Sequence, residues 1–517
     1  MTSETVENRQ QYNMAKLWQI GFFALNNTAT NIFMFILMFV TYYATGVAGL
    51  TVVVVSTVLT AMRIFDGITD PIVGFLIDKT ETKFGKFRPA MILGYIIMLV
   101  AILLMYNITH TLPMAFQLLF FVVTYGVYIV GYTLQTTVTK AAQTVLTNSP
   151  KQRPVFAVFD GIYNTLLFTG GQVFVASYLI AKHGDFNAAL FTELNTLGLF
   201  LAGVFTILAM VGIAGKDRKE FYGLADSSVQ TKFRDYWPIL KGNRPLQMLI
   251  TAVTVDKLAF SLLRHSVVIV MVFGILMGDY ALSGTISLIT IVPALLITFA
   301  AVAIARKLGM KKAFVISSWI TMFSFIGLLM LFLLVENPTT MSLSNIGLPI
   351  ILFIVLYTLA MGFGGVPSTF VNPMIADISD YETYKSGRYI PGMLGTLFSF
   401  VDKLITSLAP AIVGIAVASI GFGSKFPTVT DTLTTPLFTM TLLLAFGLPA
   451  IAMVGSIIAM KFYTLDDKKM EEIQTGIAIM KEKAKANKKE VDSPINQEES
   501  DSKIYDKKTG SIVLEKG

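Results

Sequence analysis

Long apolar runs separated by shorter polar connections dominate the chain. Twelve runs contain 18 or more mainly apolar residues, the length at which a helix crosses the hydrocarbon core of a membrane. The polar residues before the first run contain no basic stretch and no small-residue cleavage site, so we expect a retained helix and not a signal peptide. The predicted segments cover approximately residues 18–43, 52–77, 89–106, 115–138, 155–181, 196–214, 246–277, 282–305, 313–335, 346–366, 390–419 and 436–460.

Composition supports the same class of protein. Hydrophobic residues make up 54% of the 517 residues and charged residues 14%, whereas a soluble protein has about a quarter of its residues charged. The chain contains no cysteine, which excludes disulfides, thiolate zinc sites and cysteine nucleophiles. The three histidines (His110, His183 and His265) are far apart, which argues against a histidine metal cluster or a serine–histidine enzyme. We therefore expect an all-α membrane protein with no cofactor and no enzymatic activity.

The distribution of Lys and Arg predicts the orientation in the membrane. The N-terminus and the connections that follow segments 2, 4, 6, 8 and 10 hold 22 of the 40 basic residues, and the tail holds 12 more. The opposite connections hold two, Lys182 and Lys425. Because basic loops stay inside, both termini are expected to be cytoplasmic, in a protein of the plasma membrane. The net charge of +7 then reflects topology and requires no nucleic-acid partner.

The connections also predict two halves of six helices each. The longest internal connection is charged and lies between segments 6 and 7. The loop after segment 2, Gly85-Lys86-Phe87-Arg88, has an echo after segment 8, Gly309-Met310-Lys311-Lys312. Repeated halves are typical of transporters that bind substrate between them. We expect a cytoplasmic N-terminus (1–16), an N-terminal half (17–215), a central cytoplasmic loop (216–245), a C-terminal half (246–462) and a charged, largely solvated tail (463–517) with an amphipathic helix near 470–485.

Segment 2 carries the strongest set of ionisable residues at membrane depth. Arg63, Asp66 and Asp70 are spaced to share one helix face, with Thr69 between the two acids. Such residues cost several kcal/mol in a membrane, so each is a functional candidate. Two carboxylates can bind a cation such as Na⁺ or pass a proton, and Arg63 can pair with one of them while the site is empty. A purely structural ion-pair network is the alternative.

Two other segments carry basic residues in their apolar stretches. Lys403 in segment 11 could neutralise Asp66 or Asp70 and be released when a cation arrives, or it could belong to a buried structural pair with its neighbour Asp402. Lys257 and Arg264 in segment 7 are candidates for substrate contact or for structural pairing. We expect His265 to be a packed or hydrogen-bonded residue and not a proton carrier.

Polar clusters in segments 1 and 4 suggest a ligand cavity. Amides and hydroxyls both donate and accept hydrogen bonds, which suits a neutral, polyhydroxylated ligand. Interhelical hydrogen bonding is the alternative for each residue. The candidates for sugar binding are Asn27, Thr28 and Asn31 in segment 1, Tyr132, Gln135 and Thr139 in segment 4, and Arg264 in segment 7.

Two long motifs resemble those of a known family, the glycoside–pentoside–hexuronide:cation symporters of the major facilitator superfamily. One is Arg63…Asp66…Asp70-Pro71…Gly74…Gly85-Lys86-Phe87-Arg88-Pro89, and the other is Asp377…Asp380-Tyr381-Glu382…Arg388 followed by Gly392, Phe398 and Lys403. The resemblance implies the major facilitator fold, cation-driven sugar uptake, a cation site at Asp66 and Asp70, and Lys403 facing that site. It also implies a cytoplasmic gate that includes acidic and basic residues of the 10–11 loop. The gate candidates are Asp78, Arg88, Asp377, Asp380, Glu382 and Arg388.

The chain departs from the melibiose-carrier pattern of that family at two acidic positions. Asn27 or Thr28 replaces an acid on helix 1, and Gln135 replaces an acid on helix 4. These changes favour H⁺ over Na⁺ coupling and also admit an anionic sugar such as a hexuronide. The expected function is import of a sugar with H⁺ or Na⁺, by a protein that works as a monomer and has a sugar, a cation and the bilayer as its partners. The alternatives are an exchanger or exporter of organic anions or drugs that uses Lys257 and Arg264, and a transporter-like sensor that signals through its tail.

Overall fold

The computed structural model describes residues 14–79, 82–147, 152–218, 236–344, 346–387 and 391–491. Twelve helical stretches in this part are long and apolar enough to cross a membrane, so the predicted all-α membrane fold is confirmed. The N-terminal half contains α1 (Leu17–Leu37) with α2 (Val40–Tyr42), α3 (Val52–Lys79), α4 (Phe87–Ile108), α5 (Met114–Ala141), α6 (Gln143–Leu146), α7 (Arg153–Val173) with α8 (Ile180–His183), and α9 (Ala188–Ile213). The C-terminal half contains α11 (Arg244–Leu263) with α12 (Ser266–Ile269), α13 (Ala281–Leu308), α14 (Met310–Leu334), α15 (Leu348–Ser386), α16 (Pro391–Thr406) with α17 (Ala409–Ser419), and α18 (Thr435–Leu442) with α19 (Leu448–Phe462).

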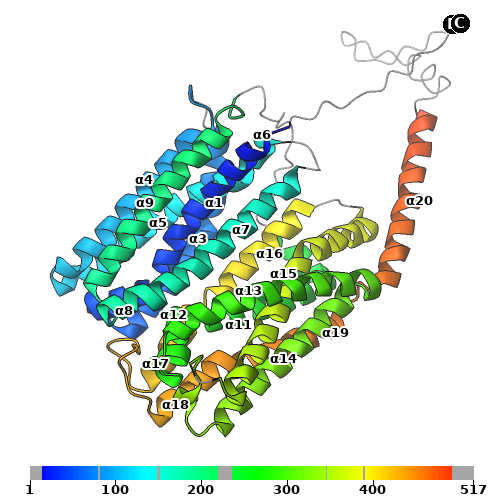
Figure 1. Cartoon of the computed structure of the whole chain (residues 1–517). Helices are drawn as coiled ribbons and strands as arrows, with labels where there is room; N and C mark the ends of the chain where they lie inside the picture. Colours follow the sequence, from blue (N-terminus) through cyan, green and yellow to red (C-terminus); the bar gives the residue numbers. More distant parts are fainter. Residues whose placement is uncertain are drawn as a thin grey trace, which may run out of the picture.

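The helices form two groups that lie side by side, α1–α9 in one and α11–α19 in the other (Figure 1). Single turns of π-helix connect α7 to α8 and α18 to α19, and π-turns also follow α2 and α12. The most buried membrane helix is α1, in which 72% of the most apolar window is buried. It packs mainly on α9 and α7, so it lies at the centre of its half.

The distribution of buried apolar side chains shows where the two halves meet. One continuous cluster contains residues of both halves and includes Phe39 and Phe186 from one and Phe426 from the other. Two further clusters lie at the end of the bundle that carries the start of α1 and the end of α15, and each belongs to one half alone. We call this the termini end and the opposite one the far end. The shared core therefore lies toward the far end, and each half has its own core at the termini end.

Hydrogen bonds and close packing between the halves also lie toward the far end. The Gln172 side-chain amide donates to Ser283 Oγ at 2.9 Å, and the Tyr42 hydroxyl donates to the Pro427 carbonyl at 3.1 Å. The backbone of Gly414 on α17 lies directly against the side chain of Ser56 on α3. Helix α17 packs extensively along α3. These contacts hold the far end closed.

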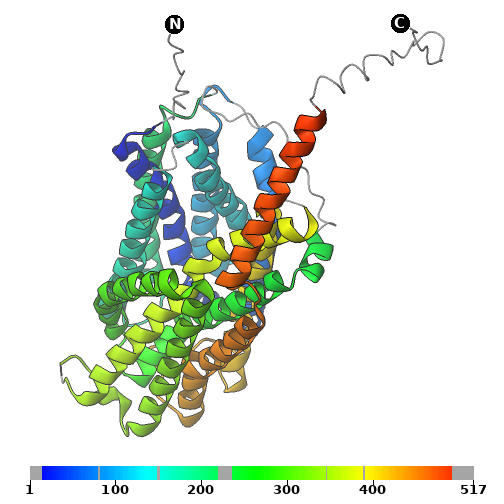
Figure 2. The same cartoon turned by 90° about the vertical axis from the view of Figure 1, so that its right-hand side faces the viewer.

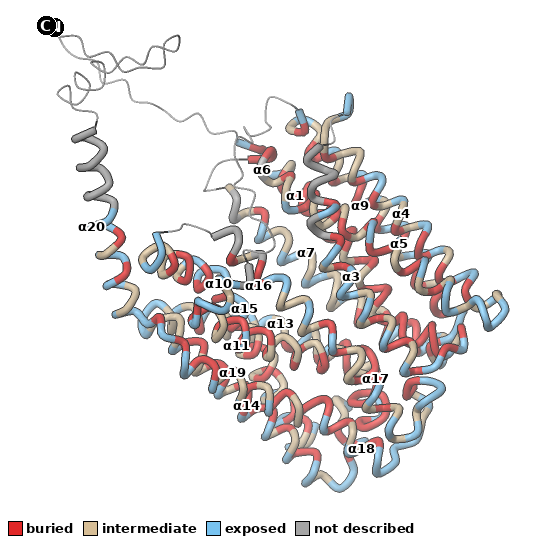
Figure 3. The backbone as a smooth tube through the Cα atoms, turned by 180° about the vertical axis from the view of Figure 1, so that it is seen from behind, coloured by how far each residue is buried: buried red, intermediate tan, exposed pale blue. Residues whose placement is uncertain are grey.

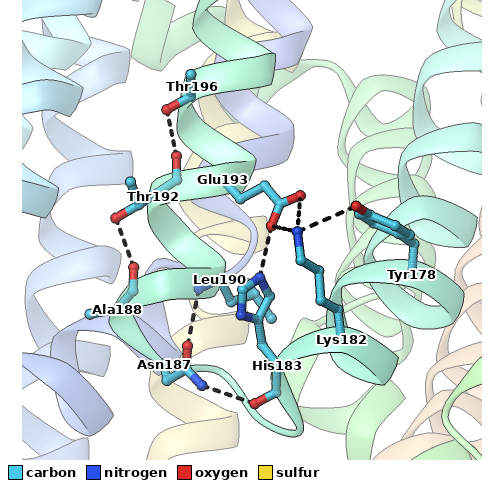
Figure 4. A network of polar contacts seen from close by, with 9 residues as sticks. All are labelled: Tyr178, Lys182, His183, Asn187, Ala188, Leu190, Thr192, Glu193 and Thr196. Atoms are coloured by element: carbon cyan, nitrogen blue, oxygen red, sulfur yellow. Dashed lines mark hydrogen bonds and ion pairs between the residues drawn. The ribbon is translucent and has the colours of Figure 1, made fainter.

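A cluster of charged side chains fixes the turn between α8 and α9 at the far end (Figure 4). Glu193 accepts from Lys182 Nζ at 2.9 Å and lies 2.8 Å from His183 Nε2. Gly184, which follows His183 in this turn, has a φ of +79°, and a residue with a side chain rarely adopts that value. Lys182, one of the two basic residues that sequence analysis assigned to this side, is therefore neutralised by an acid.

In each half, the third membrane helix begins after a glycine of positive φ that has a carboxylate packed against it. Gly85 and Gly309 precede α4 and α14 with φ values of +98° and +88°. A carboxylate that follows the sixth helix of the same half, Asp217 or Asp467, lies where a Cβ on the glycine would stand. The repeated loop that the sequence predicted thus has a repeated structure, as expected for two related halves.

Asp217 should contribute measurably to stability. Its buried carboxylate accepts hydrogen bonds from the backbone N–H groups of Lys86, Phe87 and Arg88 at 2.9–3.3 Å. Replacing it with Ala leaves these donors unpaired at a helix start, which costs about 1–3 kcal/mol. We expect the detergent-solubilised Asp217→Ala variant to unfold at a lower temperature than wild type. Glu336→Gln, on an exposed residue, is the control, and equal melting temperatures of Asp217→Ala and wild type would contradict the prediction.

Two elements differ from the sequence prediction. Segment 10 was expected to end near residue 366, but α15 continues to Ser386 through Pro367 and Pro373. The continuation is polar on one side yet buries Phe370, Met374 and Ile378 at helical spacing, so packing maintains the helix. The candidate gate residues Asp377, Asp380 and Glu382 therefore lie on a helix and not in a loop.

The second difference concerns the connections at the termini end. The central loop contains the short helix α10 (Tyr236–Gly242), and the tail begins with α20 (Asp467–Val491), which is longer than predicted. Helix α20 projects from the C-terminal half (Figure 2). It is not simply solvated, because Ile473 and Ile477 are buried and Gln474 Nε2 donates to Asp380 Oδ2 at 2.7 Å.

The outer surface carries the apolar side chains that lipid requires. Buried positions lie along the helix sides that face one another, and exposed positions lie on the outer sides (Figure 3). On α4, Leu93, Ile96, Val100 and Leu103 are each more than two-fifths exposed at helical spacing. A water-soluble bundle would bury such a stripe, whereas a membrane helix presents it to the bilayer.

Candidate cation and sugar site

An ion pair between the two halves forms the centre of the site. Lys403 Nζ on α16 lies 3.2 Å from Asp66 Oδ2 on α3. The Asp66 side chain is 9% exposed and the lysine side chain 30%. Helix α3 belongs to the N-terminal half and α16 to the C-terminal half, so this pair links the bodies that must move relative to each other in a transporter.

Two threonines orient the carboxylate of Asp66. Thr133 on α5 donates to Asp66 Oδ1 at 3.3 Å, and the hydroxyls of Thr69 and Thr133 are 3.0 Å apart. Thr69 also bonds the Asp66 carbonyl one turn earlier, at 3.0 Å. Each carboxylate oxygen of Asp66 therefore has a partner, a threonine hydroxyl on Oδ1 and the ammonium of Lys403 on Oδ2.

Asp66 also borders a small cavity within the N-terminal half. The cavity has a volume of about 80 Å³. This space holds a cation with a few water molecules but is too small for a whole sugar. Its walls come from α1, α3 and α5 and consist of Arg63, Asp66, the rings of Tyr125, Tyr128 and Tyr132, and the apolar residues Met34, Leu37, Met38, Met62 and Ile129.

The structure brings Arg63, Asp66, Thr69 and Lys403 together, and of the two expected counter-charges it is Lys403 that pairs with Asp66. The ion-pair partner of Asp66 is Lys403 from the other half. Arg63 lines the cavity among the tyrosine rings. The side chains of Asp70 and Asp78 on α3, and the whole of Arg388, lie outside the described residues.

A second ion pair lies next to the first within the C-terminal half. Lys257 Nζ on α11 is 2.8 Å from Asp402 Oδ2 on α16 and 5.4 Å from the centre of the Phe398 ring. Asp402 and Lys403 are consecutive, so their side chains point about 100° apart on the helix. Asp402 therefore pairs within its own half, whereas Lys403 pairs with Asp66 on α3 of the other half.

Arg264 lies at an interruption of the seventh membrane segment. Helix α11 ends at Leu263, Arg264 forms its C-cap, and α12 begins at Ser266. The guanidinium lies 5.8 Å from the centre of the Phe260 ring. His265 caps α12 by accepting the Val267 N–H, which agrees with the expected hydrogen-bonded role. Broken helices at mid-membrane are typical of transporter binding sites.

Several of the predicted sugar-binding residues contact other helices instead. Gln135 has no exposed surface, and its amide donates to the Met91 carbonyl on α4 at 2.6 Å. Thr139 accepts from Asn26 of α1 at 2.8 Å, and Thr28 is buried. The interhelical alternative therefore describes Gln135 and Thr139 in this conformation. Tyr132 remains at the cavity beside Asp66.

Asn27 and Asn31 have partners on α7 that the sequence analysis missed. Asn27 Nδ2 donates to Asp160 Oδ1 at 2.6 Å, and Asn31 Nδ2 donates to Asn164 Oδ1 at 2.7 Å. Asp160 is the only charged residue in the predicted segment 155–181, which is the signal that could have identified it. Its position near one end of the segment made it resemble an acid at the membrane surface.

Three of the candidate gate residues have contacts with their own half or with the tail helix α20. Arg88 Nε lies 3.5 Å from Asp217, and Glu382 accepts from Asn243 Nδ2 at 2.9 Å next to the start of α11. Asp380 accepts from Gln474 of α20. Asp377 lies one turn before these acids on α15. Contacts of this kind are expected when the termini end is open, and the gating role remains a prediction.

Comparisons with known proteins agree with this geometry. The model of the family described as MFS/sugar transport protein matches residues 22–467. The putative glycoside/cation symporter YagG of Escherichia coli is 25% identical over 443 residues, which are 84% of this chain and 88% of that one. The glucuronide carrier protein homolog of the same organism is 24% identical over 84% of this chain and 90% of its own length.

Solved structures show the same fold at lower identity. A mutant of the nucleoside transporter NupG has a TM-score of 0.61 at 12% identity, covering 86% of this chain and all of that one. A bacterial homologue of the iron transporter ferroportin in an inward-facing state has a TM-score of 0.56 over 86% of this chain and 97% of that one.

Fold, ion pair and comparisons together define a multi-pass membrane transporter with the major facilitator fold. The chain belongs to the MFS/sugar transport protein family. The resemblance drawn from its two motifs is thereby confirmed. Members of this family are membrane transporters and not enzymes.

Proposed function

We propose that this protein imports a sugar into the cell by symport with a proton. The observation that carries the proposal is the ion pair between Asp66 and Lys403, which joins the two halves at the edge of a cavity. The names of the relatives support sugar and cation as the two ligands. Asp66 and Asp70 bind the cation, with Thr69 and Arg63 beside them, and Lys403 is the counter-charge.

Coupling follows from the electrostatics of that pair. When a proton neutralises Asp66, the ion pair between Asp66 and Lys403 is lost, which weakens the attraction between α3 and α16. The cost of moving the halves then depends on whether the cation is bound, which is what a coupled transporter requires. Sugar bound between the halves should raise the affinity for the cation by the same factor that the cation raises the affinity for sugar.

The walls of the cavity favour a proton over sodium. Hard cations select several oxygen ligands. Around Asp66, half of the ten wall residues are methionines or aliphatic side chains, and the three tyrosines contribute mostly ring surface. A carboxylate beside a lysine and two threonine hydroxyls suits protonation and deprotonation without a coordination shell.

The distribution of basic residues supports an orientation with the termini end in the cytoplasm. The closed far end then faces outward, and the conformation is the one that releases sugar into the cell. We place the protein in the plasma membrane. We also propose that it works as a monomer, since a single chain supplies both halves of the site.

The geometry weakens the organic-anion alternative. That alternative needs Lys257 and Arg264 as free cationic sites, but Asp402 already neutralises Lys257 at 2.8 Å. The sensor alternative requires the tail for function, whereas a transporter without residues 470–517 should keep its uptake with altered regulation at most.

The direct test measures external pH in lightly buffered, de-energised cells that express the protein. Methyl β-D-xyloside, methyl β-D-glucoside and methyl β-D-glucuronide are added in turn, with and without Na⁺. We expect at least one of them to alkalinise the medium, with no change in cells that carry an empty vector. Sugar accumulation that depends on Na⁺ without a pH change would replace the proton by sodium, and no response to any sugar would contradict sugar symport.

A further inference from the structure

We infer that Asp160 is a specificity-determining residue of the sugar site, where its carboxylate binds hydroxyl groups of an uncharged sugar and disfavours anionic ones. This inference rests on the proposed function. The relevant structure is a ladder of two hydrogen bonds between α1 and α7, Asn27 to Asp160 and Asn31 to Asn164. The partners on each helix are four residues apart, so one turn separates the two rungs.

The exposure pattern of α1 shows that the ladder lies on the one partly exposed face of this helix. From Phe23 to Val40, the only partly exposed residues are Asn27, Asn31, Met34 and Met38, and all others are buried. Spacings of four, three and four residues place these four on one helix face. Between Phe23 and Val40, this face is the one side of α1 that its neighbours leave partly exposed.

The same face leads from the ladder to the cation cavity. Met34 and Met38 form part of the cavity wall beside Asp66. Asn31 precedes Met34 by three residues, a rise of about 4.5 Å along the helix axis. A ligand on the ladder would therefore adjoin the cavity of Asp66, as cooperative binding of sugar and cation requires.

The chemistry of the ladder suits sugar hydroxyls. Asp160, Asn164, Asn27 and Asn31 are all partly exposed, so they combine acceptor and donor groups with access for a ligand. A carboxylate that accepts from a hydroxyl forms a charge-assisted bond, stronger than a neutral one. The same negative charge repels the carboxylate of a hexuronide. The melibiose-carrier pattern has an acid on helix 1, and Asn27 or Thr28 replaces it in this chain. Asp160 on α7 supplies an acid next to Asn27 instead.

The test compares the affinities of the matched glycosides, which differ only at the sixth carbon, in wild type and Asp160→Asn. The variant keeps the size of the side chain and an oxygen that accepts from Asn27. Binding is measured as inhibition of exchange of the preferred radiolabelled glycoside, so that no gradient is needed. Wild type should prefer xyloside and glucoside to glucuronide. The variant should lose about 10- to 100-fold in affinity for the uncharged sugars and much of that preference.

Two further variants separate specificity from structure. The exchanged pair Asn27→Asp with Asp160→Asn returns one carboxylate and one amide to the same rung and should recover most of the affinity. Glu336→Gln, which removes a charge from an exposed residue, should match wild type. An Asp160→Asn protein that folds poorly and is not improved by the exchanged pair would show a structural role and overturn the inference.

Other outcomes identify which proposal fails. Unchanged sugar affinities in Asp160→Asn would refute the sugar-binding role. If the affinities were unchanged but sugar accumulation was lost, Asp160 would be a proton site instead. A wild-type preference for glucuronide that Asp160→Asn leaves unchanged would also refute it. If wild type exchanged none of the three glycosides, the proposed sugar transport itself would fail.

Discussion

Replacing Asp66 with Asn should abolish accumulation of sugar while leaving exchange of sugar across the membrane. The amide resembles a protonated carboxylate, so it cannot bind or release the coupling proton. It also removes the negative charge that lies 3.2 Å from Lys403 Nζ. The halves should still move around bound sugar, because the neutral side chain imitates the loaded state.

The expected effect is large. A membrane potential of 100 mV contributes about 2.3 kcal/mol per charge, so symport with one proton can sustain roughly 40-fold accumulation. We expect the accumulation ratio of Asp66→Asn to fall to about 1, which is simple equilibration. The measurement uses membrane vesicles with an imposed potential, and exchange is followed in the same vesicles without one.

Glu336→Gln provides the matched control, since it changes an acid to its amide on an exposed residue. It should accumulate sugar as wild type does. Accumulation by Asp66→Asn at the wild-type level would remove Asp66 from the coupling mechanism. Loss of exchange together with accumulation would instead assign Asp66 to the conformational change itself.

Replacing Gly414 with Ala should prevent the far end from closing. The added methyl group would overlap the buried side chain of Ser56, so α17 and α3 must separate. Overpacking of this kind costs about 1–3 kcal/mol, which shifts the ratio of the two conformations by roughly 5- to 150-fold. Uptake should fall because the state that opens to the termini end becomes rare.

The absence of cysteine from the chain makes this shift measurable. A cysteine introduced at Met38, beside the cavity, should react faster with an impermeant maleimide from outside in Gly414→Ala than in the parent. Adding Ser56→Gly should reverse the effect, since it removes the atoms that the methyl group meets. Gly170→Ala is the matched control, because a Cβ at Gly170 meets no atom within 4 Å. Equal labelling in all variants would contradict the role of this contact.

Local properties of the sequence determined the main features of the fold. Hydrophobic length is a property of consecutive residues, so the twelve membrane helices could be counted from the sequence. The repeated glycine loops before α4 and α14 also followed from local sequence. Asp66 and Lys403 were identifiable because a charge within an apolar stretch is costly wherever its partner lies.

Only the tertiary structure decided which side chains meet. Helix rotation and neighbours distant in sequence determine whether an amide is fully buried against another helix, as Gln135 is against α4, or stays partly exposed beside its partner, as Asn27 and Asn31 do next to α7. Asp160 is 133 residues from Asn27, and no periodicity links them. The extension of α15 likewise depends on apolar residues that pack against the rest of its half. The sequence therefore determined which residues lie at membrane depth, whereas the packing of the helices selected their partners and the end of the bundle that is closed.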